Sequence, residues 1–141
     1  MEEFESFIKR KIVKKSFSDI ERAKKLVKDG RSRLIDVELL NLNKMPKFVF
    51  ENTYDAIRDF LLAILIKDGY KTSSHEALIS YLLKKDFDVY SVGRLDQFRY
   101  KRNGSKYYGE GVSIQEAEDI VLFYKQIKSK IDKLIKESRL E

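Results

Sequence analysis

A short segment in the last third of the chain, RNGSKYYG, combines residue types that bind phosphates and aromatic bases. It contains an arginine, an amide, a lysine and two adjacent tyrosines, which are Arg102, Asn103, Lys106, Tyr107 and Tyr108. Together with Arg99, the basic and amide residues recur at spacings of three, four and seven and so share one face of a helix. Such a set can hold a phosphate through charge-assisted hydrogen bonds while a tyrosine stacks on a base. The alternative is an ordinary helix C-terminus with both tyrosines in the core.

A second polar group interrupts an otherwise apolar segment between about residues 48 and 68. Asp55, Arg58 and Asp59 follow Tyr54 there, and the two carboxylates lie one helical turn apart. Charges on a buried helix must be paired or must face a cleft. We expect these three residues to support the arginine site. The two carboxylates could form a salt bridge with Arg99 or Arg102, or one of them could be catalytic. Two carboxylates alone are a weak signal for a metal site.

The chain has a single histidine, His75, and no cysteine. These counts exclude disulfides, thiolate zinc sites, thiol nucleophiles and a multi-histidine metal site. His75 lies in KTSSHEAL at a predicted helix start, where it is expected to be a surface or capping residue near Glu76. We expect no metal and no cofactor.

The composition favours one helical domain. The chain has 141 residues, 43% hydrophobic and 37% charged, with one proline and six glycines. It lacks an apolar run of membrane-spanning length and begins without the order of a signal peptide, so we expect a cytoplasmic protein and no membrane partner. The net charge is +6. Of three basic clusters, at 9–15, 22–33 and 99–106, the first two are interpreted as solvated surface.

Hydrophobic spacing predicts an all-α bundle with short connections. Serines followed three residues later by glutamate predict helix starts at Ser18, Ser73 and Ser113. The long helix after Ser18 has room for a bend at Gly30, and Asn103 and Gly104 are expected to end another helix. A first helix is expected near the N-terminus, and the later helices at about 48–68, 74–85, 89–103 and 113–136. The 48–68 helix is expected to be central because apolar residues cover most of its circumference.

Two segments resemble the HEPN (higher eukaryotes and prokaryotes nucleotide-binding) family. LDQFRYKRNGSKYYGEGVSIQEAEDIVLFYKQIKSKI resembles the C-terminal half of HEPN domains, in which a helix carrying an apolar-x-x-x-R-x-x-RN pattern precedes a short loop and a long final helix. NTYDAIRDFLLAILIKDGYKTSSHEALISYL is similar to the family's central helix, turn and His-bearing segment. The resemblance covers about residues 48–131, with the N-terminal helices in 1–45. It implies a single HEPN-like domain over 1–141, an up-down bundle of about five helices.

The resemblance also implies a homodimer with the motif in the dimer cleft. Members of the HEPN family cleave RNA without a metal or bind nucleic acids or nucleotides, often as the toxin-like partner of a small nucleotidyltransferase. The family's ribonuclease motif is an arginine, commonly followed by a polar residue, with a histidine after four to six intervening residues. Arg102 and Asn103 match its start, but Tyr107 and Tyr108 occupy the histidine positions. A tyrosine with a pKa near 10 is a poor general base at neutral pH.

The leading hypothesis is a degenerate member of a toxin-antitoxin-type system, which binds RNA or a nucleotide through Arg99, Arg102, Asn103, Lys106 and the two tyrosines without cleaving it. The first alternative is an active, metal-independent ribonuclease toxin that uses Arg102 and Asn103 with Tyr107 or Tyr108. The second is a non-enzymatic interaction module that pairs with a small nucleotidyltransferase.

Overall fold

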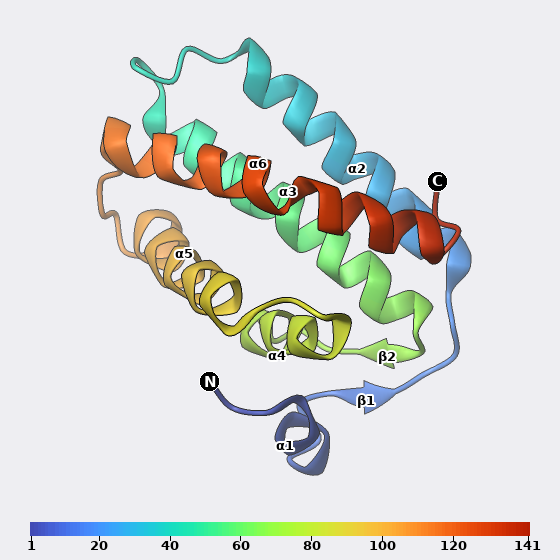
Figure 1. Ribbon diagram of the computed structural model, residues 1–141. Helices are drawn as coiled ribbons and strands as arrows, with labels where there is room; N and C mark the ends of the chain where they lie inside the picture. Colours follow the sequence, from blue (N-terminus) through green and yellow to red (C-terminus); the bar gives the residue numbers. More distant parts are fainter.

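The computed structural model describes all 141 residues and is mostly helical (Figure 1). The all-α prediction is confirmed, with six α-helices, as many as the predicted ranges and one more than the resemblance implies. None of them is long and apolar enough to cross a membrane. The elements are α1 (Phe4–Lys9), β1 (Lys14–Lys15), α2 (Ile20–Leu39), α3 (Pro46–Lys67), β2 (Tyr70–Lys71), α4 (His75–Tyr81), the 3₁₀ helix η1 (Leu82–Lys85), α5 (Val89–Tyr107) and α6 (Ile114–Glu137).

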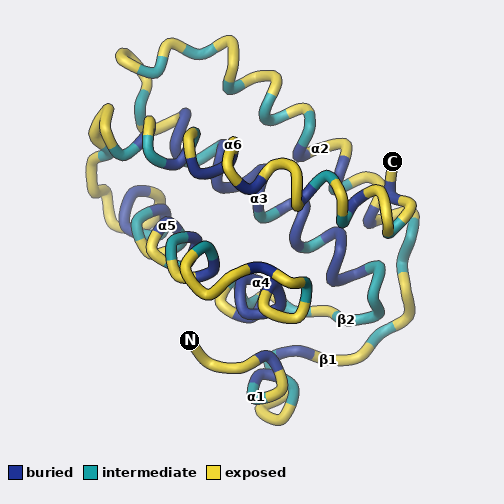
Figure 2. The backbone as a smooth tube through the Cα atoms, viewed as in Figure 1, coloured by how far each residue is buried: buried dark blue, intermediate teal, exposed yellow.

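Helix α3 is the centre of the molecule, as its apolar sequence predicts. It contacts α2, α4, α5 and α6, and it is buried along most of its length (Figures 1 and 2). Pro46 occupies its first turn, where a missing N–H costs nothing, and Gly69 follows its end with a φ of 90°. The helix therefore presents the polar residues of its middle turns to several neighbours at once.

The N-terminal segment closes the lower end of the bundle. Strands β1 and β2 form a two-residue antiparallel ribbon, in which Lys14 pairs with Lys71. Phe4 and Phe7 of α1 are buried in a second, smaller apolar cluster against α3 and α4. This ribbon and this cluster connect the N-terminus to the end of α3.

Helix starts follow the predicted capping chemistry with one-residue shifts. Ser113 and Glu116 form both hydrogen bonds of a capping box at α6, as predicted. At α2 and α4 the capping residues are Asp19 and Ser74, one residue after the predicted serines. The predicted Ser18 instead donates its hydroxyl hydrogen bond to a backbone carbonyl at the end of α3.

The predicted end of α5 is wrong, because the helix continues through Asn103 and Gly104 to Tyr107. Gly104 is buried, and a β-carbon there would collide with the carboxylate of Glu110. Its carbonyl also accepts the Glu110 backbone N–H at 3.1 Å. The left-handed residue is Gly109, with a φ of 68°, in the following loop. Gly104 thus permits close packing of the loop rather than ending the helix.

Gly30 likewise serves packing rather than a bend. Helix α2 runs unbroken through it, and Gly30 is buried against α3. A β-carbon at Gly30 would lie 2.6 Å from Cε1 of Phe60. The missing side chain therefore lets the two helices approach closely.

Candidate functional site

Arg102 lies inside the protein, between two aromatic rings. Only 2% of the residue is exposed. Its Nη2 donates a hydrogen bond to Asp55 Oδ1 at 3.0 Å, and its Nη1 donates one to the Tyr107 hydroxyl at 3.3 Å. The guanidinium carbon lies 5.6 Å from the centroid of the Tyr54 ring and 5.5 Å from that of Tyr107. These contacts fix the guanidinium in place, and only its Nε lacks a partner.

Two buried carboxylates on α3 share four cations from three helices. The nitrogens nearest to Asp55 belong to Arg102 at 3.0 Å, Arg58 at 3.7 Å, Lys106 at 3.8 Å and Arg33 at 3.9 Å. Asp59 pairs with Arg33 at 3.0 Å and with Arg58 at 3.4 Å. Burial raises the pKa of Asp59, and the two arginines oppose that rise. We call these six residues the charged cluster. Its cations outnumber its carboxylates, so it attracts an anion.

The charged cluster has a closed interior and an open rim. The side chains of Asp55, Asp59 and Arg102 are at most 6% exposed. By contrast, the Lys106 side chain is 42% exposed and that of Arg33 is 37% exposed. Tyr107 and the neighbouring Tyr108 are also exposed, so neither belongs to the core. An incoming anion would meet the rim before it reached Arg102.

The structure brings together only part of the predicted site. It joins Arg102, Lys106 and Tyr107 to the supporting residues of α3, but it directs Arg99 elsewhere. Arg99 pairs with Asp96 at 2.8 Å and with Glu76 at 3.7 Å. The Asn103 side chain makes no hydrogen bond. Helix α5 continues through all four residues of the predicted face, so they lie within about 100° of one another around its axis, but Arg102 points toward α3 and is buried whereas Lys106 is exposed.

Arg33 is a cluster residue that the sequence analysis missed. It belongs to the basic segment 22–33, which was interpreted as solvated surface. In the structure the Arg33 guanidinium is not simply solvated. Its Nε donates a hydrogen bond to Asp59, and its Nη1 donates one to Asn52 Oδ1 at 3.3 Å. The available signal was indirect: two carboxylates on a buried helix require nearby cations.

His75 also lies closer to the site than predicted. It is half-buried against Tyr54, with its Nδ1 3.1 Å from the Tyr54 hydroxyl and the rings stacked with centroids 5.9 Å apart. Burial, assisted by the positive charges of Arg58 and Arg102, lowers the pKa of His75 to about 4. Burial raises the pKa of Tyr54. At neutral pH both side chains are therefore uncharged, and His75 is neither the cap of α4 nor a surface residue.

Acidification is expected to destabilise the protein through His75. Its pKa is 6.5 in the unfolded chain and about 4 in the folded one, so the unfolded state binds more protons between these values. Stability is therefore lost as the pH falls from 6.5 toward 4, by about 1–2 kcal/mol once partial exposure is allowed for. Urea unfolding of the wild type and of His75→Gln at several pH values measures this. The difference between the two proteins should change across this window. A constant difference would contradict the prediction.

No three or more His, Asp or Glu side chains gather as they would around a metal ion. Asp55 and Asp59 instead face arginines and a lysine. What the arrangement offers chemically is positive charge, exposed aromatic rings and a fixed guanidinium.

Comparisons of the chain with protein-family models, with curated proteins and with solved structures give no match. The resemblance to HEPN domains therefore remains a prediction from the residues themselves.

Proposed function

We propose that the charged cluster and its tyrosines bind a phosphate-bearing ligand, with RNA as the ligand class, and do not cleave it. The observation that carries the proposal is the arrangement of four cations around two carboxylates beside exposed tyrosines. A phosphate would balance the excess positive charge. The absence of the histidine that the HEPN ribonuclease motif requires is consistent with RNA binding without cleavage.

In this proposal the rim and the interior have different tasks. Lys106 and Arg33 are exposed enough to reach a phosphate, and Tyr107 and Tyr108 are exposed enough to stack on bases. Arg102 and Asp55 are buried, so they position Tyr107 and Lys106 instead of touching the ligand first. Each role therefore predicts a different consequence of substitution.

The test is binding of a labelled single-stranded RNA, followed by fluorescence anisotropy. Tyr108→Ala should weaken binding by about tenfold because one stacked base is lost. Lys106→Ala should also weaken it, and should reduce the salt slope by about 0.7 because one phosphate contact is removed. Neither side chain is buried, so both variants should fold normally.

Lys24→Ala is the matched control, because Lys24 is an exposed lysine of α2 outside the charged cluster. It should bind RNA as the wild type does. Equal losses in Lys24→Ala and Lys106→Ala would show binding by net charge only and would overturn the proposed site. A chain that does not bind RNA but co-purifies with a nucleotidyltransferase would favour the interaction module instead.

Cleavage of RNA is the second candidate function, and one contact favours it. The Tyr107 hydroxyl accepts a hydrogen bond from Arg102 at 3.3 Å, which joins the two residues that the alternative requires. The Tyr107 oxygen would take the proton of the 2′-hydroxyl as that oxygen attacks the phosphorus and displaces the 5′-oxygen of the next nucleotide, which receives the proton. The arginine would stabilise the charge on the phosphate. RNA incubated with the protein and a chelator would then yield fragments ending in a cyclic phosphate. Tyr107→Phe should abolish cleavage while keeping the stacking ring and RNA binding.

A further inference from the structure

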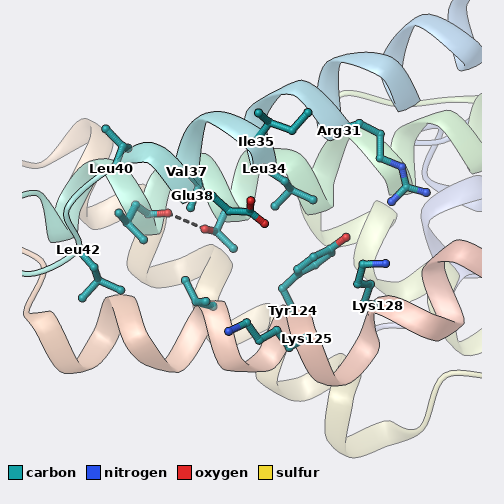
Figure 3. Close-up of a pocket in the computed structure, with 13 residues that line it drawn as sticks. Arg31, Leu34, Ile35, Val37, Glu38, Leu40, Leu42, Tyr124, Lys125 and Lys128 are labelled. Atoms are coloured by element: carbon teal, nitrogen blue, oxygen red, sulfur yellow. Dashed lines mark hydrogen bonds between the residues drawn. The ribbon is translucent and has the colours of Figure 1, made fainter.

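A large apolar groove lies between α2 and α6, with α3 as its floor (Figure 3). Its volume is about 640 Å³, which falls within the range of small-molecule sites. Most of its surface is apolar, contributed mainly by Leu34, Val37, Leu40, Leu42, Val49 and Val121. We call this the α2–α6 groove.

The α2–α6 groove exists because the two helices that border it meet at only one end. Arg31 of α2 pairs there with Asp132 at 2.8 Å and with Glu141 at 2.9 Å. Beyond that link the helices diverge toward the C-terminal end of α2 (Figure 1). Partly exposed apolar side chains of both helices line the gap between them, above the buried Val49 and Thr53 of α3.

The two ends of the groove differ in chemistry. Figure 3 shows Leu40 and Leu42 at one end and the Tyr124 hydroxyl near Arg31 and Lys128 at the other. Tyr124 is only 7% exposed, yet its hydroxyl donates no hydrogen bond to any group of the protein. Burial also raises its pKa, so the hydroxyl keeps its proton and remains a donor. An unpaired buried hydroxyl is costly, and a ligand that accepted its hydrogen bond would remove that cost.

Three basic residues and one acidic residue line the rim of the groove. They are Arg31, Lys125 and Lys128, against the single carboxylate of Glu38. Arg31 is already held by two carboxylates, and Lys128 shares Asp132 with it at 2.6 Å. No ion pair involves Lys125. Lys125 is therefore the cation without an ion-pair partner, and one such charge suits a singly charged acidic headgroup rather than a multiply charged phosphate.

We propose that the α2–α6 groove binds a free long-chain carboxylic acid, with the carboxylate at Tyr124, Lys125 and Lys128 and the acyl chain along the apolar walls. The apolar wall accounts for the chain, and the orphan hydroxyl with the lysines accounts for the headgroup.

This site is independent of the charged cluster. Val49 and Thr53 of α3 line the groove, whereas Asp55 and Asp59 hold the cluster. With 3.6 residues per turn, these pairs are centred about 120° apart around the helix axis, so they face different neighbours. Failure of one proposal therefore leaves the other intact, and RNA binding should be unchanged by groove substitutions.

The test is calorimetric titration of the full chain with dodecanoic acid below its micelle concentration, and with its methyl ester as the uncharged comparison. The acid should bind saturably, one molecule per chain, and more tightly than the ester. Lys128→Ala and Tyr124→Phe should each weaken binding of the acid by about tenfold, since each removes one partner of a charged group. Lys133→Ala, an exposed lysine of the same helix outside the groove, should bind as the wild type does.

A second variant tests the groove without changing its charges. Val121→Trp fills it from the partly exposed side and should abolish binding of acid and ester alike, with an unchanged circular dichroism spectrum. Absence of saturable binding to the wild type would overturn the proposal. So would binding of anionic vesicles without binding of the free acid, or self-association in sedimentation experiments that Val121→Trp abolishes, because these outcomes assign the groove to a membrane or to a second copy of the chain.

Discussion

Arg102→Ala is expected to lower the free energy of unfolding by about 3 kcal/mol. The substitution leaves Asp55, whose side chain is 6% exposed, with only the longer contacts to Arg58, Lys106 and Arg33 at 3.7–3.9 Å. It also removes the cation that lies against the rings of Tyr54 and Tyr107. Urea denaturation at pH 7, monitored by circular dichroism, measures the loss.

Arg99→Ala is the matched control for this prediction. Arg99 lies one turn earlier on α5, and its partner Asp96 has a side chain that is 36% exposed. Such a pair contributes less than about 1 kcal/mol. The double substitution Asp55→Asn/Arg102→Met should recover much of the stability, because it removes the charge that Arg102→Ala leaves unpaired. If both alanine variants lose the same free energy of unfolding, the buried Arg102 pair contributes no more to stability than the exposed Arg99 pair.

The buried position of Arg102 also affects how binding experiments are interpreted. If Arg102→Ala loses RNA binding, the loss combines a structural effect with any direct phosphate contact. The rim substitutions at Lys106 and Tyr108 avoid this problem because both side chains are exposed. The rim variants therefore test the proposed function, and the interior variants test how the buried ion pair stabilises the fold.

The sequence predicts the helices better than it predicts their ends. The start of α6 could be predicted because Ser113 and Glu116 satisfy each other locally. At α2, both Ser18 and Asp19 can cap a helix, and the choice is decided by a tertiary contact of Ser18 with the end of α3. The end of α5 was missed for the same kind of reason. A glycine that ends a helix and one that admits a neighbouring Glu110 side chain look alike in a sequence.

The candidate site shows the same division between local and tertiary information. Buried charges on α3 predicted an ion pair, and Asp55 does pair with Arg102. Arg33 and His75 reach the site from α2 and α4, so their contribution depends on how those helices pack against α3. No spacing within one helix contains that information. The sequence also cannot show that the Tyr124 hydroxyl lacks a partner, because a tyrosine on the apolar stripe of a helix predicts only a core residue.

Gly30→Leu is expected to lower the free energy of unfolding by about 3 kcal/mol, and Gly30→Ala by about 1 kcal/mol. Alanine improves the helix propensity of α2, but its β-carbon would lie 2.6 Å from the Phe60 ring. Phe60 is fully buried, and its ring also contacts Tyr124 and Arg31, so it has little room to move. Thermal unfolding and urea midpoints measure the effect.

Gly93→Ala is the control that separates propensity from packing. Gly93 lies inside α5 and a β-carbon there would meet nothing within 4 Å, so alanine should stabilise the protein by about 1 kcal/mol. The two glycine-to-alanine substitutions should therefore have opposite signs. Adding Phe60→Leu should reduce the cost of Gly30→Ala, because the smaller side chain makes room for the methyl group. If Gly30→Ala stabilises the protein as Gly93→Ala does, the close approach of α2 and α3 is not what requires the glycine.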